Sequence, residues 1–336
     1  MEQTFSNNEI TTLLKSKYDI GEIKEITRVT AGASSECYYI ATHDSEFIFK
    51  DIEVNFMNNP EQEPLISKVL SEAGIPVATF YQTRDGEYIW SESGRVFHLQ
   101  SFIKGQILPV NTAPEWFMNE SSNILGRIHK ALESIPLLKE GIGEGFFNFF
   151  NPETVRGFYL KTLEVAQQNK ETRIINDVEY RISLLDMIKE IKLNMKQFTC
   201  KNTHGDYFIS QIICGKNSIN GIIDLTAACV HPVSWEIIRS YSFADPECIN
   251  GNLQFENLKK YIGCYLKYSD LNDYDLKMMP YVFFYQLVVS NYFNQYYVSK
   301  NSNRKILLDY AHWSTSLCRW FEKNVQRLSD QLVRAF

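Results

Sequence analysis

The chain has 336 residues, 44% of them hydrophobic and 22% charged, which is the composition of a folded globular protein and excludes a disordered one. The formal net charge of −6 argues against general nucleic-acid binding and favours a cationic small-molecule partner. No apolar run reaches the ~18 residues that crossing a bilayer requires, so no association with a membrane is expected.

The cysteines are scattered along the chain without a C-x-x-C pair, a pattern typical of a reducing compartment. They are Cys37, Cys200, Cys214, Cys229, Cys248, Cys264 and Cys318. The N-terminus lacks the basic stretch and apolar core of a secretory signal. We therefore expect a cytoplasmic protein without disulfides or structural zinc. Whether it is a monomer or a homodimer stays open.

The first part of the chain favours antiparallel strands. After a short helix expected over 7–17, β-branched and aromatic residues predict strands at 23–29, 37–40 and 46–52. In the third strand Phe47 and Phe49 fall on one face and Lys50 on the other. Lys50 is therefore either a solvated strand-edge lysine or a lysine directed into a site. The small-residue turn at 31–35 is, by itself, also compatible with an ordinary hairpin.

A helix is predicted from Glu63 to about Ala73, because this apolar segment and the Ala-Gly-Ile-Pro-Val that ends it resemble a pattern of the superfamily named below. Pro64 fits its first turn, where a missing N–H costs little. Glu63 is a candidate partner for Lys50. Glu61 competes with it, because a proline on either side leaves the local geometry open.

Two more strands are predicted at 88–90 and 96–103, and the second ends in a Lys-Gly pair that we expect to link two halves of the chain. Beyond residue 113 the spacing of apolar residues becomes helical. Helices are expected over 119–132, 152–168 and 172–197, a loop with aromatic anchors over 136–155, and three or four further helices within 252–336. His129 is interpreted as a packed, hydrogen-bonded core histidine rather than a catalyst.

Two carboxylates, Asp206 and Asp224, flank a predicted hairpin. Apolar runs at 211–214 and 221–223 are separated by a polar turn at 215–220. The hairpin would bring both acids to the mouth of one cleft. Such a pair suits phosphoryl transfer, in which one acid orients or deprotonates a hydroxyl and the other holds magnesium. Two surface aspartates beside an ordinary hairpin are the simpler alternative.

The segments His-Gly-Asp at 204–206 and Ile-Ile-Asp-Leu at 222–225 resemble the catalytic segment of the aminoglycoside phosphotransferase and choline kinase-like superfamily. Leu-Gly-Arg-Ile-His at 125–129 is similar to a second motif of that superfamily. The resemblance implies an α+β, bilobal, protein-kinase-like fold. Its small N-terminal antiparallel-sheet lobe would span residues 1–104, and its larger, mostly helical lobe residues 105–336.

The resemblance also implies an ATP or GTP site between the lobes. Gly32, Ser34 and Ser35 would let backbone N–H groups and a hydroxyl approach the β- and γ-phosphates. Lys50 would hold the α- and β-phosphates, with Glu63 as its ion-pair partner. The backbone of the linking strand would bracket the adenine edge, at Gln100, Ser101 and Phe102.

In the same resemblance, Asp206 would accept or orient the proton of the acceptor hydroxyl, and Asp224 and Gln211 would bind Mg²⁺. Gln211 stands where the superfamily has Asn, and its longer side chain must approach a metal from a different backbone distance. Glu236 is expected to stabilise the catalytic loop from below without being a ligand.

The stretch from Asp224 to Pro232 is too short for the activation segment of a protein kinase, which favours a small molecule as acceptor. The predicted activity is ATP-dependent transfer of the γ-phosphate to a hydroxyl of an aminoglycoside-, choline- or homoserine-like acceptor. Departures from the superfamily motifs favour the alternative of a weakly active or inactive nucleotide-binding or scaffold protein; they lie at Ala31, Ser35, 208–210 and Gln211.

Overall fold

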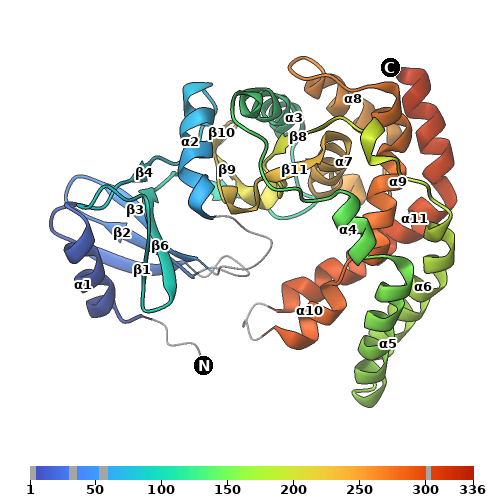
Figure 1. The fold of residues 1–336 in the computed structure, drawn as a ribbon, viewed down its shortest axis with the longest axis horizontal. Coiled ribbons are helices and arrows are strands. Elements are labelled where there is room, and N and C mark those ends of the chain that lie inside the picture. The colour runs from blue at the N-terminus through green and yellow to red at the C-terminus, as the bar shows by residue number, and fades with distance from the viewer. Residues whose placement is uncertain (1–4, 30–35, 53–59, 300–303) are drawn as a thin grey trace.

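The computed structural model describes residues 5–29, 36–52, 60–299 and 304–336 (Figure 1). Its N-terminal part is a six-stranded antiparallel sheet in the order β1-β2-β3-β6-β4, with β5 paired to β6. The strands are β1 (Glu25–Val29), β2 (Glu36–Ala41), β3 (Glu46–Ile52), β4 (Phe80–Tyr81), β5 (Ile89–Glu92) and β6 (Arg95–Ser101). The three predicted N-terminal strands are present within one or two residues of their expected ends.

One face of this sheet carries its own hydrophobic core. Phe47 and Phe49 of β3 are buried together with Phe97 of β6, and the rings of Phe49 and Phe97 stack with their centroids 5.4 Å apart. Helix α1 (Asn7–Lys17) adds Ile10 to the same core. Because side chains alternate along a strand, Lys50 is directed to the opposite face.

Helix α2 (Glu63–Glu72) lies between the sheet and the helical part of the molecule (Figure 1). Its buried Ile66 and Leu70 join the hydrophobic core of the helical part, not the core under β3. Helix α2 therefore precedes residue 104 in the chain but packs with the helices that follow it. A domain boundary at residue 104 stays a prediction.

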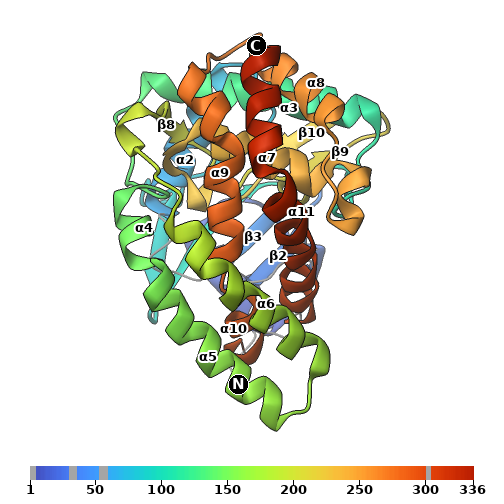
Figure 2. The same ribbon diagram turned by 90° about the vertical axis from the view of Figure 1, so that its right-hand side faces the viewer.

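The rest of the chain is mainly helical, as expected. In Figures 1 and 2, α9 and α11 run alongside each other, and α5 and α6 form an adjacent pair. The helices are α3 (Glu115–Ala131), α4 (Glu144–Phe149), α5 (Pro152–Gln168), α6 (Thr172–Lys189), α7 (Val233–Ala244), α8 (Phe255–Tyr265), α9 (Asp273–Val289), α10 (Tyr292–Val298) and α11 (Lys305–Ala335). Among the described residues, no helix combines the length and apolarity needed to cross a bilayer.

Two expectations for this part were wrong. The aromatic stretch predicted as a loop contains the short helix α4, and the helix predicted over 172–197 ends at Lys189. A separate 3-10 turn follows at Met195–Gln197, where the side chain of Asn194 accepts from the N–H of Lys196. Asn194 thus begins a new turn by bonding to nearby backbone, after the helix has already ended.

Buried Arg181 ties the C-terminal helices together. Its guanidinium donates to Leu287 O and Ser290 Oγ at the end of α9 and to Thr315 Oγ1 on α11. Neutral oxygens surround the charge closely, which offsets the cost of burying it. These bonds fix the junction after which α10 begins, at Tyr292.

The predicted hairpin is confirmed: β9 (Ile212–Cys214) pairs antiparallel with β10 (Ile219–Ile222), and β7 (Gln106–Ile107) adds to β9. In the chain, β8 (Cys200–Thr203) precedes the hairpin and β11 (Cys229–Pro232) follows it. These two strands pair with each other as an antiparallel ribbon. The loops that carry Asp206 and Asp224 therefore both connect this ribbon with the hairpin.

Candidate active site

The loop that carries Asp206 has a backbone that only glycine fits. Gly205 has φ +81°, and a Cβ at this position would lie 1.8 Å from the carbonyl oxygen of Ala227. Buried His204 braces the loop: its Nδ1 accepts from Asp206 N–H at 3.3 Å, and its Nε2 lies 3.0 Å from Ile223 O. The His-Gly-Asp triplet thus couples the Asp206 loop to the residue before Asp224.

Lys50 and Asp224 meet across the interface between the sheet and the helical part. The distance from Lys50 Nζ to Asp224 Oδ1 is 2.7 Å, although the residues are 174 positions apart in the chain. Thr226 Oγ1 donates to the same oxygen at 2.9 Å. Burial would raise the pKa of Asp224, but Lys50 outweighs it and lowers the pKa to about 2.

Glu63, not Glu61, is the acid that faces Lys50, but it does so without a direct ion pair. Its Oε1 accepts from Leu225 N–H at 3.0 Å, and among ion pairs of the described residues Lys50 has only the one to Asp224. The expectation of a Lys50–Glu63 ion pair is therefore corrected. Glu63 accepts from the backbone just after Asp224, and Asp224 forms the ion pair with Lys50. Burial would lower the pKa of Lys50, but Glu63 and Asp224 outweigh it and raise the pKa.

Burial raises the pKa of Glu63 to about 7, against the pull of Lys50. His98, directly opposite Lys50 on β6, is fully buried with its Nδ1 3.5 Å from Glu63 Oε2. Among the described residues neither ring nitrogen has a hydrogen-bond partner. Burial lowers the pKa of His98 well below its usual value, so the ring beside Glu63 is neutral.

A pH dependence of stability follows from Glu63. In the unfolded chain it ionises near its ordinary pKa of 4.5, whereas in the folded protein it holds its proton to about 7. The proton held by folded Glu63 therefore stabilises the protein fully below pH 4.5. This stabilisation is lost as the pH rises from 4.5 to about 7, and above that it changes no further. Glu63→Gln keeps the shape and the acceptor for Leu225 N–H but cannot ionise.

We expect the stability of Glu63→Gln relative to the unsubstituted protein to rise by on the order of 3 kcal/mol between about pH 5 and about pH 8. Urea unfolding at the two pH values measures this difference. Glu61→Gln, on an exposed side chain, is the matched control, and its stability relative to the unsubstituted protein should not change between the two pH values. Equal pH profiles for Glu63→Gln and the unsubstituted protein would contradict the assignment.

Asp206 has partners on both of its oxygens. Gln211 Nε2 donates to Oδ2 at 3.1 Å, and Arg239 Nη2 donates to Oδ1 at 2.5 Å. Burial raises the pKa of Asp206 against the opposing effect of Arg239. Arg239 was not among the residues predicted from the sequence. The available signal was its position three residues after Glu236 on α7, which puts both side chains on one helix face.

Glu236 and His129 lie under the Asp206 loop. Glu236 Oε1 accepts from Tyr207 N–H at 3.3 Å, and its Oε2 lies 2.7 Å from His129 Nε2. The other ring nitrogen of His129 lies 2.9 Å from the hydroxyl of Tyr265. Burial raises the pKa of Glu236, but His129 outweighs it and lowers the pKa to about 2. His129 is thus the hydrogen-bonded core residue that was predicted.

The adenine contacts expected at Gln100, Ser101 and Phe102 stay a prediction. Gln100 lies within β6, Ser101 N–H donates to Thr79 O at 2.8 Å, and Phe102 N–H donates to Glu46 O at 3.0 Å. The N–H groups of Ser101 and Phe102 therefore already have backbone acceptors. Among the described residues, the first amide beyond them without an acceptor is that of Ile103. The expected phosphate-binding residues Gly32, Ser34 and Ser35 lie outside the described residues.

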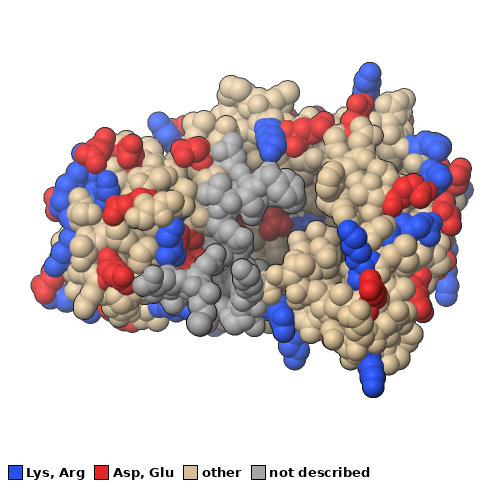
Figure 3. Space-filling model, turned by 60° about the horizontal axis from the view of Figure 1, so that its bottom comes forward, with Lys and Arg blue, Asp and Glu red and all other residues tan. Residues whose placement is uncertain are grey.

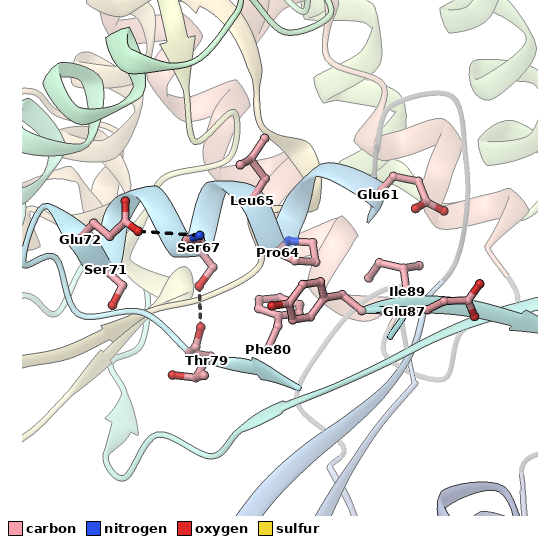
Figure 4. Close-up of a pocket in the computed structure, with 13 residues that line it drawn as sticks. Glu61, Pro64, Leu65, Ser67, Ser71, Glu72, Thr79, Phe80, Glu87 and Ile89 are labelled. Atoms are coloured by element: carbon pink, nitrogen blue, oxygen red, sulfur yellow. Dashed lines mark hydrogen bonds and ion pairs between the residues drawn. The ribbon is translucent and has the colours of Figure 1, made fainter. Parts of the chain in front are cut away.

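A hollow of about 640 Å³ lies elsewhere, between α2 and the β4–β5 region. Figure 4 shows Glu61, Pro64 and Phe80 among its lining residues. None of the predicted site residues lines it, so it is separate from the cluster around Lys50. Figure 3 shows a different recess, at the middle of the molecule, in which a few acidic side-chain atoms are visible.

Residues 25–260 match the model of the phosphotransferase enzyme family. Homoserine kinase of Zymomonas mobilis is 25% identical over 240 residues, which cover 70% of each chain.

Two solved structures have the same fold. Spectinomycin phosphotransferase in complex with ADP and spectinomycin has a TM-score of 0.67 at 16% identity, covering 96% of this chain and 100% of the other. Choline kinase of Cryptosporidium parvum has a TM-score of 0.61 at 14% identity, covering 98% of each. They confirm the kinase-like α+β architecture. The chain belongs to the phosphotransferase enzyme family, and its enzyme class is that of the small-molecule kinases.

Proposed function

We propose that this protein transfers the γ-phosphate of ATP to a hydroxyl of a small molecule. The observation that carries the proposal is the convergence of Lys50 and Asp224, 2.7 Å apart, beside the loop that presents Asp206. A cation for the phosphates, an ionised acid for a metal and a second acid for the acceptor are the groups that phosphoryl transfer needs.

Lys50 is the proposed phosphate-binding residue. When a nucleotide enters, its phosphate oxygens replace Asp224 as the partner of the ammonium, and Asp224 becomes available as a metal ligand. Glu63 keeps the backbone after Asp224 in place through Leu225 N–H. The Ile103 N–H is the proposed donor to the adenine edge.

Asp224 and Gln211 fit a magnesium site. Ile223 N–H donates to Gln211 O at 3.0 Å, so the two candidate ligands stand on adjoining backbone. The Gln211 amide donates its Nε2 to Asp206, which leaves its carbonyl oxygen for a cation. Carboxylate and amide oxygens are ligands that Mg²⁺ accepts, and in kinases it needs only one or two carboxylates beside the phosphates. A bound Mg²⁺ would neutralise charge on the phosphates.

The proposed step forms one bond and breaks one. The acceptor oxygen bonds to the γ-phosphorus while the bond from that phosphorus to the bridging oxygen breaks, and ADP leaves with the electron pair. Asp206 orients the hydroxyl and takes its proton. Positioning and charge neutralisation then supply most of the lowering of the barrier.

A nucleotide-binding protein without transfer activity is the second candidate. It is favoured by one observation: both oxygens of Asp206 already have partners, Gln211 and Arg239. A carboxylate has more lone pairs than these two bonds use, so an acceptor hydroxyl still has a place on Asp206.

The two candidates differ in turnover. We expect ATP with Mg²⁺ to raise the melting temperature, and ADP release to become acceptor-dependent with a panel of small alcohols. GTP in the same assays tests the nucleotide. Stabilisation by ATP without acceptor-dependent ADP release would favour the binding protein, and the absence of any shift would contradict both candidates.

A further inference from the structure

Arg239 places a fixed positive charge at the acid proposed to receive the acceptor hydroxyl. It lies on α7 and is buried, with its side chain 10% exposed. Its Nη2 donates to Asp206 Oδ1 at 2.5 Å and its Nη1 to Tyr207 O at 3.4 Å. A guanidinium carries more N–H donors than these contacts use, in a planar fork that matches a second carboxylate.

Aromatic rings hold this guanidinium in place. Its central carbon lies 4.6 Å from the ring centroid of Phe208, 5.0 Å from that of Phe243 and 5.6 Å from that of Trp235. These distances are within the range of cation–π attraction. Aromatic cages of this kind also bind ligand ammonium groups. Here the chain's own cation occupies the cage, so an ammonium from outside would meet both its bulk and its charge.

Two tyrosines, Tyr292 and Tyr310, lie near Asp206 and Arg239. Tyr292 of α10 and Tyr310 of α11 lie against each other, with centroids 5.9 Å apart, and Tyr310 also contacts Phe243. Burial raises the pKa of both hydroxyls, and among the described residues the only carboxylate with a resolved effect on either is Asp206, beside the cation Arg239. Two phenols and an arginine are hydrogen-bond donors for an anion.

We propose that Arg239 selects acceptors that carry a carboxylate close to the hydroxyl, and disfavours cationic acceptors that lack one. The inference rests on the proposed function and names the substrate class of the same site. The acceptor hydroxyl bonds to Asp206, while its carboxylate accepts from those N–H groups of Arg239 that Asp206, Tyr207 O and Tyr292 do not use. The net charge of the chain favoured a cationic acceptor. The positive charge of Arg239 beside Asp206 instead favours an acceptor with an anionic group.

Matched acceptor pairs test this directly. L-homoserine and 3-aminopropan-1-ol, L-serine and ethanolamine, and L-threonine and 1-aminopropan-2-ol differ within each pair by one carboxylate. With ATP and Mg²⁺, we expect the best carboxylate-bearing acceptor to exceed its partner by about 10- to 100-fold in kcat/KM, mainly through KM, because a hydrogen-bonded charge is worth that much.

Arg239→Met should bring this ratio to within about twofold, because the methionine fills the cage without a charge. Arg239→Lys keeps a charge but loses the fork, so it should retain part of the preference, and it keeps the test available if the methionine variant does not fold. Arg319→Met is the matched control: this arginine pairs with Asp177 between α11 and α6, and its loss should change neither activity nor ratio.

The outcomes separate the inference from the function it rests on. If Arg239 only positions Asp206, Arg239→Met lowers kcat for both members of a pair equally and leaves the ratio unchanged, which overturns the inference. Preference for the decarboxylated members, or nucleotide binding without transfer to any acceptor in the panel, overturns it as well. Failure to bind ATP at all overturns the proposed function together with the inference.

Discussion

Replacing Asp224 with asparagine is expected to lower kcat/KM by at least about 10³-fold and to remove the metal dependence of nucleotide binding. Asp224 has φ +62°, a left-handed conformation that Asn tolerates better than Ala does, so the substitution removes the charge with little strain. The substitution replaces the carboxylate that is the proposed metal ligand and that pairs with Lys50 in this structure.

Calorimetric titration with ATP, with and without Mg²⁺, and ADP release at saturating acceptor measure the two effects. Asp44→Asn, on an exposed turn of the N-terminal sheet, is the control and should behave as the unsubstituted protein does. If Asp224→Asn kept its kcat at saturating Mg²⁺, Asp224 would not be the metal ligand.

Asp206→Asn is expected to lower kcat by about 10²- to 10⁴-fold, the usual contribution of a positioned acid or base. Asn can still accept from Arg239 and still fits after Gly205, so the loop should keep its shape. ATP should still bind, because Lys50 and Asp224 are untouched. The acceptor hydroxyl, in contrast, would lose the group that takes its proton.

Single-turnover phosphorylation of the acceptor, followed alongside ATP affinity, separates chemistry from binding. The contrast with Asp224→Asn is the internal control: one variant loses metal-dependent binding, and the other loses transfer alone. A kcat near that of the unsubstituted protein would mean that Asp206 does not act on the acceptor, and Asp206→Asn with weakened ATP binding would place it on the nucleotide side instead.

Much of the fold follows from local patterns. The alternation of Phe47, Phe49 and Lys50 predicts both β3 and the face on which Lys50 lies, because neighbouring side chains in a strand point in opposite directions. The apolar runs around 215–220 predict the hairpin for a similar reason. Patterns were less reliable at helix ends: the helical spacing continues past Lys189, but the polar Asn194 bonds to local backbone and the helix has already ended.

The sequence by itself determined the family, the hairpin, the strand position of Lys50 and the loop of Asp206, because each depends on residues close together in the chain. Only the tertiary structure decided that Lys50 pairs with Asp224 and not with Glu63, that Glu63 holds Leu225 N–H, and that Arg239 lies on Asp206. Those contacts depend on how α2 and α7 pack against the sheet and the hairpin. Local periodicity sets which face of a helix is buried, but it does not specify which distant residue that face meets.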